Sequence, residues 1–153
     1  MFNLSKEAEL FLNDNKDKKI VFTNGCFDIL HSGHIGYLND AKNLGDLLFI
    51  GLNSDSSVRK LKGEQRPIND ELERKCILEN LKAVDFVEVF SEETPIELIK
   101  KVGPDYLVKG GDWPIDQIVG HEFVLKNGGI VKSLPFKDGY STTSVIDKIK
   151  KLV

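Results

Sequence analysis

The chain has 153 residues, of which 41% are hydrophobic and 29% charged. These values are typical of a folded protein, and the length predicts a single domain over residues 1–153. The formal net charge of −3 argues against a nucleic-acid-binding protein that relies on general basicity. No run approaches the roughly 18 consecutive apolar residues of a membrane span. The two cysteines, Cys26 and Cys76, are far apart and predict free thiols in a cytoplasmic protein.

Short apolar runs alternate with amphipathic segments along the chain, and their spacing and flanking residues predict the elements. In chain order we expect a helix at 2–12, a strand at 19–25, a helix at 33–45, a strand at 46–54, a charged loop, a helix at 69–84, a strand at 85–90, a helix at 94–102, a strand at 105–111, a helix at 114–129, a strand at 130–136 and a helix at 141–153.

Strands that are short, apolar at consecutive positions and separated by helices are typical of a parallel sheet covered on both faces. The predicted fold class is therefore α/β, a Rossmann-like open sheet of five parallel strands with helices on both faces. Ligands of such sheets bind beyond the carboxyl ends of the strands. Small and polar residues gather at these ends, at 23–25, 53–55, 109–112 and 136–139, and they predict a ligand site there.

The stretch TNGCFDILHSGH, residues 23–34, places two histidines where the first strand gives way to a helix. We expect no metal at this pair, because the ligands of a closed zinc site are not completed nearby. His121 is expected to be a surface histidine. The phosphate-binding patterns GxxxxGK[ST] and GxGxxG are both absent.

A phosphate site explains the histidine pair better. Gly25 would let backbone amides approach a phosphate, and the helix that begins near Gly33 offers free N–H groups and a positive dipole end. His31 and His34 can donate hydrogen bonds to oxygens that gain charge as a phosphate is attacked. The alternative is that the two histidines only satisfy backbone carbonyls in a loop.

Five segments carry a resemblance to a known family: FTNGCFDILHSGHIGYLNDAKNLGD, GLNSDSSVRKLKGEQRPI, AVDFV, PDYLVKGGDW and GYSTT. In this order they resemble the HxGH nucleotidyltransferase superfamily and, within it, the adenylyltransferases of ADP-heptose synthesis. The resemblance implies transfer of AMP from ATP to D-glycero-β-D-manno-heptose 1-phosphate, with release of pyrophosphate, for lipopolysaccharide core biosynthesis. It also implies that Mg²⁺ accompanies the ATP.

The same resemblance assigns roles to residues. The expected catalytic residues are His31, His34, Lys60, Lys62 and Arg74. The histidines would contact the triphosphate and the lysines would clamp phosphates from a mobile loop, although a solvated charged loop is the alternative for them. Arg74 would reach a phosphate of the acceptor or the nucleotide, with Arg66 as its companion.

The residues expected around the nucleotide are Thr23, Asn24, Gly25, Phe27, Asp28, Gly33, Asn53, Asp55, Lys109, Gly110, Gly111, Asp112, Ser141, Thr142 and Thr143. Asp28 is expected to brace its loop, since an ionised acceptor phosphate needs little general-base help. The three hydroxyl residues would hold the β- or γ-phosphate, or simply cap a helix. Cytidylyltransferases carry an arginine just before this motif, and Lys137 is the one candidate to replace it.

Two other functions stay open. One is a cytidylyltransferase for glycerol 3-phosphate or a similar alcohol phosphate, and the other is a nucleotide-binding module without catalysis. The segments VKGGD and GHEFVLKNGG favour the heptose enzymes. Apolar helix faces are compatible with a homodimer, and a separate heptose kinase is expected to supply the sugar phosphate.

Overall fold

The computed structural model describes residues 2–136 and 139–153. The elements in chain order are α1 (Lys6–Asp14), β1 (Ile20–Gly25), α2 (Ser32–Lys42), β2 (Leu47–Asn53), α3 (Asp55–Lys62), α4 (Glu71–Glu79), β3 (Phe86–Phe90), α5 (Ile96–Val102), β4 (Tyr106–Gly110), the 3-10 helix η1 (Ile115–Gln117), α6 (His121–Lys126), β5 (Ile130–Leu134) and α7 (Thr142–Lys150).

The five strands form one sheet in the order β3-β2-β1-β4-β5. All neighbouring pairs are parallel, so the predicted fold class is confirmed. The chain winds outward from β1 in one direction to β3 and then returns beside β1 with β4. The order therefore reverses between β1 and β4, where open parallel sheets bind their ligands.

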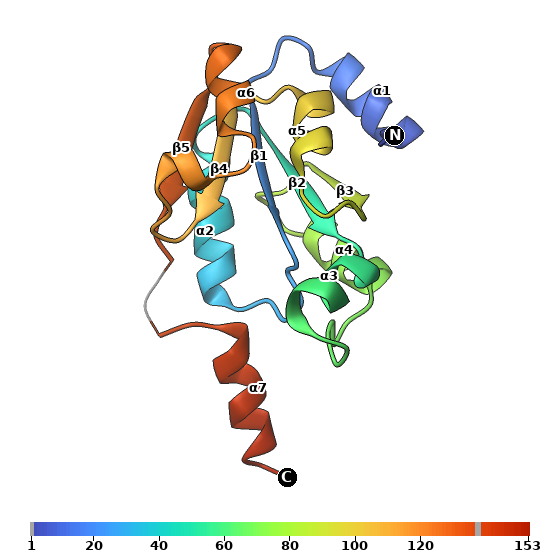
Figure 1. Cartoon of the computed structure of the whole chain (residues 1–153), viewed down its shortest axis with the longest axis vertical. Helices are drawn as coiled ribbons and strands as arrows, with labels where there is room; N and C mark the ends of the chain where they lie inside the picture. Colours follow the sequence, from blue (N-terminus) through green and yellow to red (C-terminus); the bar gives the residue numbers. More distant parts are fainter. Residues whose placement is uncertain (1, 137–138) are drawn as a thin grey trace.

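Both faces of the sheet are buried, which explains the apolar residues at consecutive strand positions. Val21 and Ile50 face the core shared with α2 and α4, whereas Phe22 and Phe49 face the core shared with α1, α5 and α6. Each of these four side chains is fully buried. Helices thus cover the sheet on two sides (Figure 1).

A helix, α3, replaces the charged loop that we expected after the second strand. Ser54 caps it by accepting a hydrogen bond from the backbone N–H of Ser57, and Val58 is its one fully buried apolar side chain. Basic residues in the last turn complement the helix dipole. The expected helix at 114–129 is also corrected: Gly120, with φ of 90°, separates η1 from α6.

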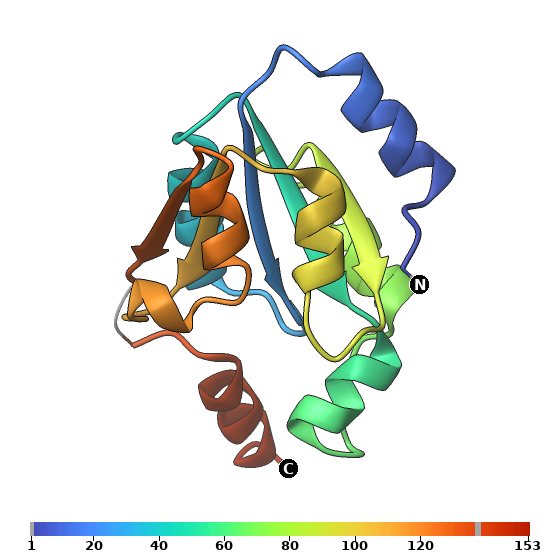
Figure 2. The same cartoon turned by 45° about the horizontal axis from the view of Figure 1, so that its top comes forward.

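The first and last helices lie at opposite ends of the sheet. Ser5, the N-cap of α1, donates through its backbone N–H and its hydroxyl to the buried Glu88 at 2.6 and 2.8 Å. At the other end, α3 and α7 project beyond the carboxyl ends of the strands, on either side of the end of β1 (Figure 2). No helix in the described part of the chain has the length and hydropathy that a membrane crossing requires.

Candidate active site

A cleft lies beyond the carboxyl ends of the strands, between α3 and α7. Its main part encloses about 450 Å³, and two adjoining hollows of about 210 and 230 Å³ share Asn24 and Lys109 with it. This size suits a nucleotide-sized ligand. The main part is lined by Asn24, Gly25, Cys26, Phe27, Asp28, His34, Asn53, Leu61, Lys62, Arg66, Glu93, Pro95, Lys109, Thr142 and Thr143.

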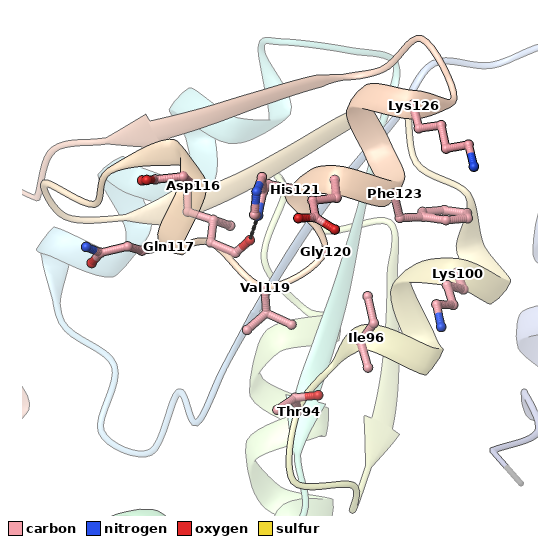
Figure 3. Close-up of a pocket in the computed structure, with 12 residues that line it drawn as sticks. Thr94, Ile96, Lys100, Asp116, Gln117, Val119, Gly120, His121, Phe123 and Lys126 are labelled. Atoms are coloured by element: carbon pink, nitrogen blue, oxygen red, sulfur yellow. Dashed lines mark hydrogen bonds between the residues drawn. The ribbon is translucent and has the colours of Figure 1, made fainter.

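A larger hollow of about 660 Å³ lies between α5 and the segment that leads into α6 (Figure 3), next to the 210 Å³ hollow, with which it shares Gln117, Ile118 and Val119. It is an open groove that holds none of the residues expected to act on phosphate. His121 lines this hollow and is half-buried, and its Nδ1 lies 2.9 Å from the backbone carbonyl oxygen of Ile118. We therefore place the chemistry in the smaller cleft at the strand ends.

The two histidines lie at the start of α2, where His31 is the N-cap. The rings are 3.9 Å apart between centroids. The backbone N–H of His31 donates to Nδ1 of His34 at 3.3 Å, so the proton of a neutral His34 belongs on Nε2. The side chain of His34 lines the cleft and therefore offers it an N–H donor.

Burial, followed by the neighbouring His31, lowers the pKa of His34 to about 4. Burial also lowers the pKa of His31. Both rings are thus neutral at physiological pH in the free protein. A bound triphosphate would favour their charged forms, since an opposite charge raises the pKa of an imidazole.

The absence of a side chain at Gly33 leaves room for the ring of His31. A Cβ there would come within 2.9 Å of the His31 ring and 3.1 Å of Cβ of Tyr140. Phe27 contacts the pair from the other side, with its ring 5.9 Å from that of His34. Its φ of 47° is a strained value for a bulky residue, and such strain concentrates at functional sites.

Asp28 braces the loop, as the sequence predicted. Its buried carboxylate accepts hydrogen bonds from Nε of Arg66 at 2.6 Å and from the backbone N–H groups of Ile68 and Asn69 at 2.8 and 2.9 Å. Burial alone would raise the pKa of Asp28, but these hydrogen bonds outweigh it and lower the pKa. The carboxylate thereby holds Arg66 at the cleft.

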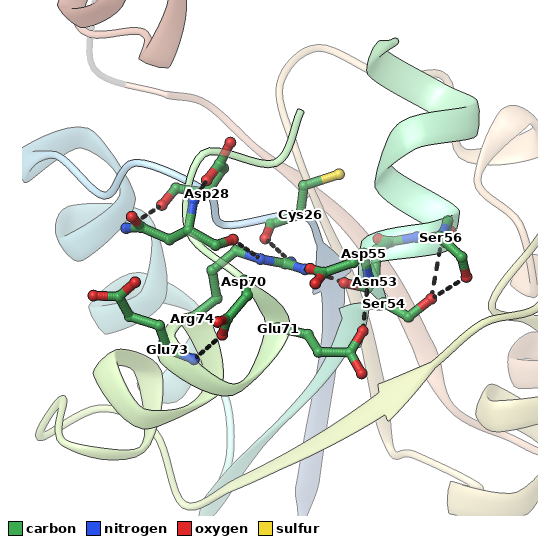
Figure 4. Close-up of polar contacts among 12 residues, drawn as sticks. Cys26, Asp28, Asn53, Ser54, Asp55, Ser56, Asp70, Glu71, Glu73 and Arg74 are labelled. Atoms are coloured by element: carbon green, nitrogen blue, oxygen red, sulfur yellow. Dashed lines mark hydrogen bonds and ion pairs between the residues drawn. The ribbon is translucent and has the colours of Figure 1, made fainter. Parts of the chain in front are cut away.

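Arg74 lies beneath the site rather than in it. Its side chain is 0% exposed, and the guanidinium donates to the carbonyls of Asn69, Cys26 and Asn53 at 2.9, 2.7 and 2.8 Å. It also donates to Asp55 Oδ1 at 2.8 Å, as Figure 4 shows. The expected contact with a phosphate is therefore wrong for this structure, because protein acceptors take up the buried donors. Arg74 instead ties the ends of β1 and β2 to the start of α3.

Only one of the two lysines that we expected to clamp phosphates lies at the cleft. Both lie in the last turn of α3, but Lys62 lines the cleft whereas Lys60 does not. Lys109, at the end of β4, lines all three parts of the cleft. Burial lowers the pKa of Lys109; the interaction with Cys26 opposes this effect, and the charge of Lys62 adds to it.

The remaining strand-end residues divide between lining and support. The hydroxyl of Thr23 is bonded to that of Tyr37 at 2.6 Å, so Thr23 joins β1 to α2. Asn53 donates to Ser57 Oγ at 2.9 Å and also lines the cleft. Asp55 is held by Arg74. At the end of β4, Gly110 lines one part of the cleft, whereas Gly111 and Asp112 do not.

The hydroxyl residues before α7 also have different positions. Ser141 caps the helix by accepting from the backbone N–H of Ser144 at 3.0 Å. Thr142 and Thr143 line the cleft, and Thr142 Oγ1 also donates to the carbonyl of Ile29 at 3.1 Å. Lys137, the candidate substitute for an arginine, lies outside the described residues.

Four residues that line the main part of the cleft were not expected from the sequence. They are Cys26, Leu61, Glu93 and Pro95. Cys26 and Leu61 lie beside expected residues, so their neighbours were a signal. Nothing in the sequence placed Glu93 and Pro95 at the cleft, because they follow β3, which is two strands from β1.

The lining is rich in groups that bind anions. Lys62, Arg66 and Lys109 bring positive charge, and His34 adds a donor. Two carboxylates line the cleft: Asp28, which accepts hydrogen bonds from its own loop, and Glu93. Among the described residues, no group of three His, Cys, Asp or Glu side chains could hold a metal ion. The arrangement is suited to a polyphosphate ligand.

Comparison with known proteins agrees with this geometry. Residues 22–148 match the cytidylyltransferase-like family. The chain is 56% identical over 146 residues to "Bifunctional protein HldE" of Campylobacter jejuni subsp. doylei, covering 95% of this chain and 31% of that protein. The protein of the same name from a Marinomonas species is 57% identical over 131 residues, 86% of this chain and 28% of its own length. The chain thus spans about three-tenths of the length of these curated relatives.

Solved structures give the same result. The crystal structure of "the lipopolysaccharide core biosynthesis protein" from Thermoplasma volcanium has a TM-score of 0.64 and 32% identity, covering 81% of this chain and 99% of that one. A pantoate-β-alanine ligase from Francisella tularensis, complexed with an ATP analogue and β-alanine, has a TM-score of 0.58 at 15% identity, covering 94% and 75%. The second shows the fold alone. From the family match and the 32% identical structure together, the chain belongs to the cytidylyltransferase-like nucleotidyltransferase family.

Proposed function

We propose that this domain transfers AMP from MgATP to D-glycero-β-D-manno-heptose 1-phosphate, giving ADP-heptose and pyrophosphate for lipopolysaccharide core biosynthesis. The observation that carries the proposal is the neutral histidine pair at the start of α2, of which His34 lines a cleft with three cationic side chains. The motif resemblance to adenylyltransferases of ADP-heptose synthesis supports the choice of substrates. So does the identity of more than half to proteins named HldE.

In this reaction an oxygen of the acceptor phosphate attacks the α-phosphorus of ATP. A new P–O bond forms as the bond to the pyrophosphate oxygen breaks, so no covalent enzyme intermediate is needed. The acceptor phosphate is already ionised at neutral pH, and a general base has little to add. Catalysis then depends on positioning and on neutralising charge.

The residues of the cleft fit these two tasks. The Nε2–H of His34 and the free amides at the start of α2 donate to the α-phosphate as its charge grows. Lys62 and Lys109 neutralise the phosphates, and Thr142 and Thr143 at the start of α7 hold the leaving pyrophosphate. No cluster of three His, Cys, Asp or Glu side chains among the described residues would hold a metal ion, so Mg²⁺ would enter with ATP and would supply positive charge to its phosphates.

Other residues act by holding these groups in place. Asp28 fixes Arg66 at the edge of the cleft. Arg74 fixes the strand ends that carry Cys26 and Asn53. The hydroxyl pair of Thr23 and Tyr37 attaches α2 to the sheet. We further propose that a separate heptose kinase supplies the acceptor.

The test is a substrate panel with pyrophosphate release as the readout. MgATP with heptose 1-phosphate and MgCTP with glycerol 3-phosphate are run side by side, together with both crossed pairs. Turnover with the first pair alone is expected. Turnover with the second pair alone would refute the proposed substrates. Nucleotide binding without any turnover would refute the proposal that the domain is an enzyme.

A further inference from the structure

The cleft contains one carboxylate that phosphate chemistry does not explain. Glu93 lines its main part together with Lys62, Arg66 and Lys109. It lies in the loop between β3 and α5, two residues before Pro95, which also lines the cleft. A negative charge among phosphate-binding groups would repel a phosphate, so phosphate binding does not account for Glu93.

The second carboxylate of the lining shows the contrast. Asp28 is buried and accepts three hydrogen bonds from its own loop. Glu93 is exposed, and within residues 2–136 and 139–153 its carboxylate has no hydrogen bond or ion pair to another side chain. Its oxygens are thus available to a ligand, and in a site that presents mostly donors they are acceptors.

The acceptor of the proposed reaction has groups that need such oxygens. Besides its phosphate, a heptose 1-phosphate carries several hydroxyl groups, and hydroxyl groups donate well to a carboxylate. Cleft residues already divide by position: Lys109 with Trp113 lies on the β4 side, whereas Asn53, Lys62 and Glu93 come from the side of β2, α3 and β3. A nucleoside placed on the β4 side, beside Lys109 and Trp113, would leave the side of Glu93 for the sugar.

We propose that Glu93 is a specificity-determining residue that accepts hydrogen bonds from hydroxyl groups of the acceptor sugar. This inference rests on the proposed function and adds a residue to it. It explains why Glu93 lines a cleft whose cationic side chains bind anions. It also predicts that acceptors with fewer hydroxyl groups are used poorly for a reason other than their phosphate.

The experiment compares Glu93→Gln and Glu93→Ala with the wild type, varying each substrate in turn. Glu92→Gln is the matched control, because it removes the same charge one residue away and outside the cleft lining. For Glu93→Ala we expect kcat/KM for heptose 1-phosphate to fall about 10–100-fold, the range for a lost hydrogen bond to a charged group. Glu93→Gln keeps an acceptor oxygen and should lose less. The KM for ATP and the magnesium dependence should stay within about twofold of the wild type, since only sugar contacts are lost.

A second substrate makes the test sharper. Deoxy analogues of heptose 1-phosphate, each lacking one hydroxyl group, are given to the wild type and to Glu93→Ala. The analogue lacking the bonded hydroxyl should be a poor substrate for the wild type, yet should cause no further loss in Glu93→Ala, because the two changes remove the same interaction.

Three results would overturn the inference. Kinetics unchanged in Glu93→Ala would make Glu93 an ordinary loop carboxylate. A shift confined to the ATP KM and the magnesium dependence would assign the carboxylate to the metal that ATP brings. A wild-type protein that does not turn over heptose 1-phosphate would remove both the proposed function and this inference, whereas the first two results leave the function intact.

Discussion

Arg74 offers a clear test of how the site is held together. Replacing it with alanine leaves three carbonyls, those of Cys26, Asn53 and Asn69, without their donor, and leaves Asp55 without its ion-pair partner. Breaking a buried ion pair from one side costs about 3–5 kcal/mol. For a domain of this size we expect the Tm to fall by about 6–20 °C, at about 2–4 °C per kcal/mol.

The assay is urea or thermal unfolding of Arg74→Ala beside Arg59→Ala. Arg59 is an exposed arginine of α3, so its removal should change the free energy of unfolding by no more than about 0.5 kcal/mol. Arg74→Lys should recover only part of the loss, because one ammonium cannot replace a planar group that bonds in four directions.

The opposite result would refute this reasoning. If Arg74→Ala were as stable as Arg59→Ala but had a greatly raised KM for ATP or for the acceptor, the guanidinium would contact a phosphate. The sequence-based prediction of a phosphate contact would then be right, and the buried position of Arg74 would not be the state that acts.

Three further predictions follow from the histidines and lysines. Gly33→Ala should lower turnover at least about tenfold, because the added methyl group displaces the His31 ring. In the free energy of unfolding, a gain of about 1 kcal/mol in helix propensity offsets part of an overpacking cost of about 1–3 kcal/mol, and an unfolding experiment measures the difference. Because the pKa of His34 falls from 6.5 to about 4 on folding, the unfolded chain binds more protons in that window, so stability is lost as pH falls through it. Urea unfolding across the window should show a smaller loss in His34→Gln. Lys62→Ala should lower kcat/KM about 10–100-fold and Lys60→Ala less than about twofold, since only Lys62 lines the cleft, and equal losses would contradict this.

The sheet could be predicted from the sequence because its residues are informative one by one. Val21, Phe22, Phe49 and Ile50 are apolar at consecutive positions, which indicates a strand buried on both faces. Helix α3 could not be predicted in this way. Its sequence carries charge on most of its surface, and it has a single fully buried apolar residue, Val58. Its position depends on contacts with Arg74 that come from α4.

The candidate site was predictable where one local segment builds it. His31, Gly33 and His34 lie within four residues, and the helix start that they form follows from local spacing. Arg74 and Glu93 could not be placed, because their surroundings come from distant parts of the chain. Two of the three carbonyls that accept from Arg74 belong to Cys26, just after β1, and to Asn53, the last residue of β2. A basic residue in a charged helix gives no sign of burial.

The most direct measurement of the central claim follows the phosphorus atoms of ATP. The purified protein is given heptose 1-phosphate with ATP labelled at the α-phosphorus, and in a parallel sample with ATP labelled at the γ-phosphorus. We expect the α label to enter a sugar nucleotide and the γ label to leave in pyrophosphate, with both transfers greatly reduced in His34→Ala. Transfer of the γ label to the sugar, or no transfer of either label, would contradict it.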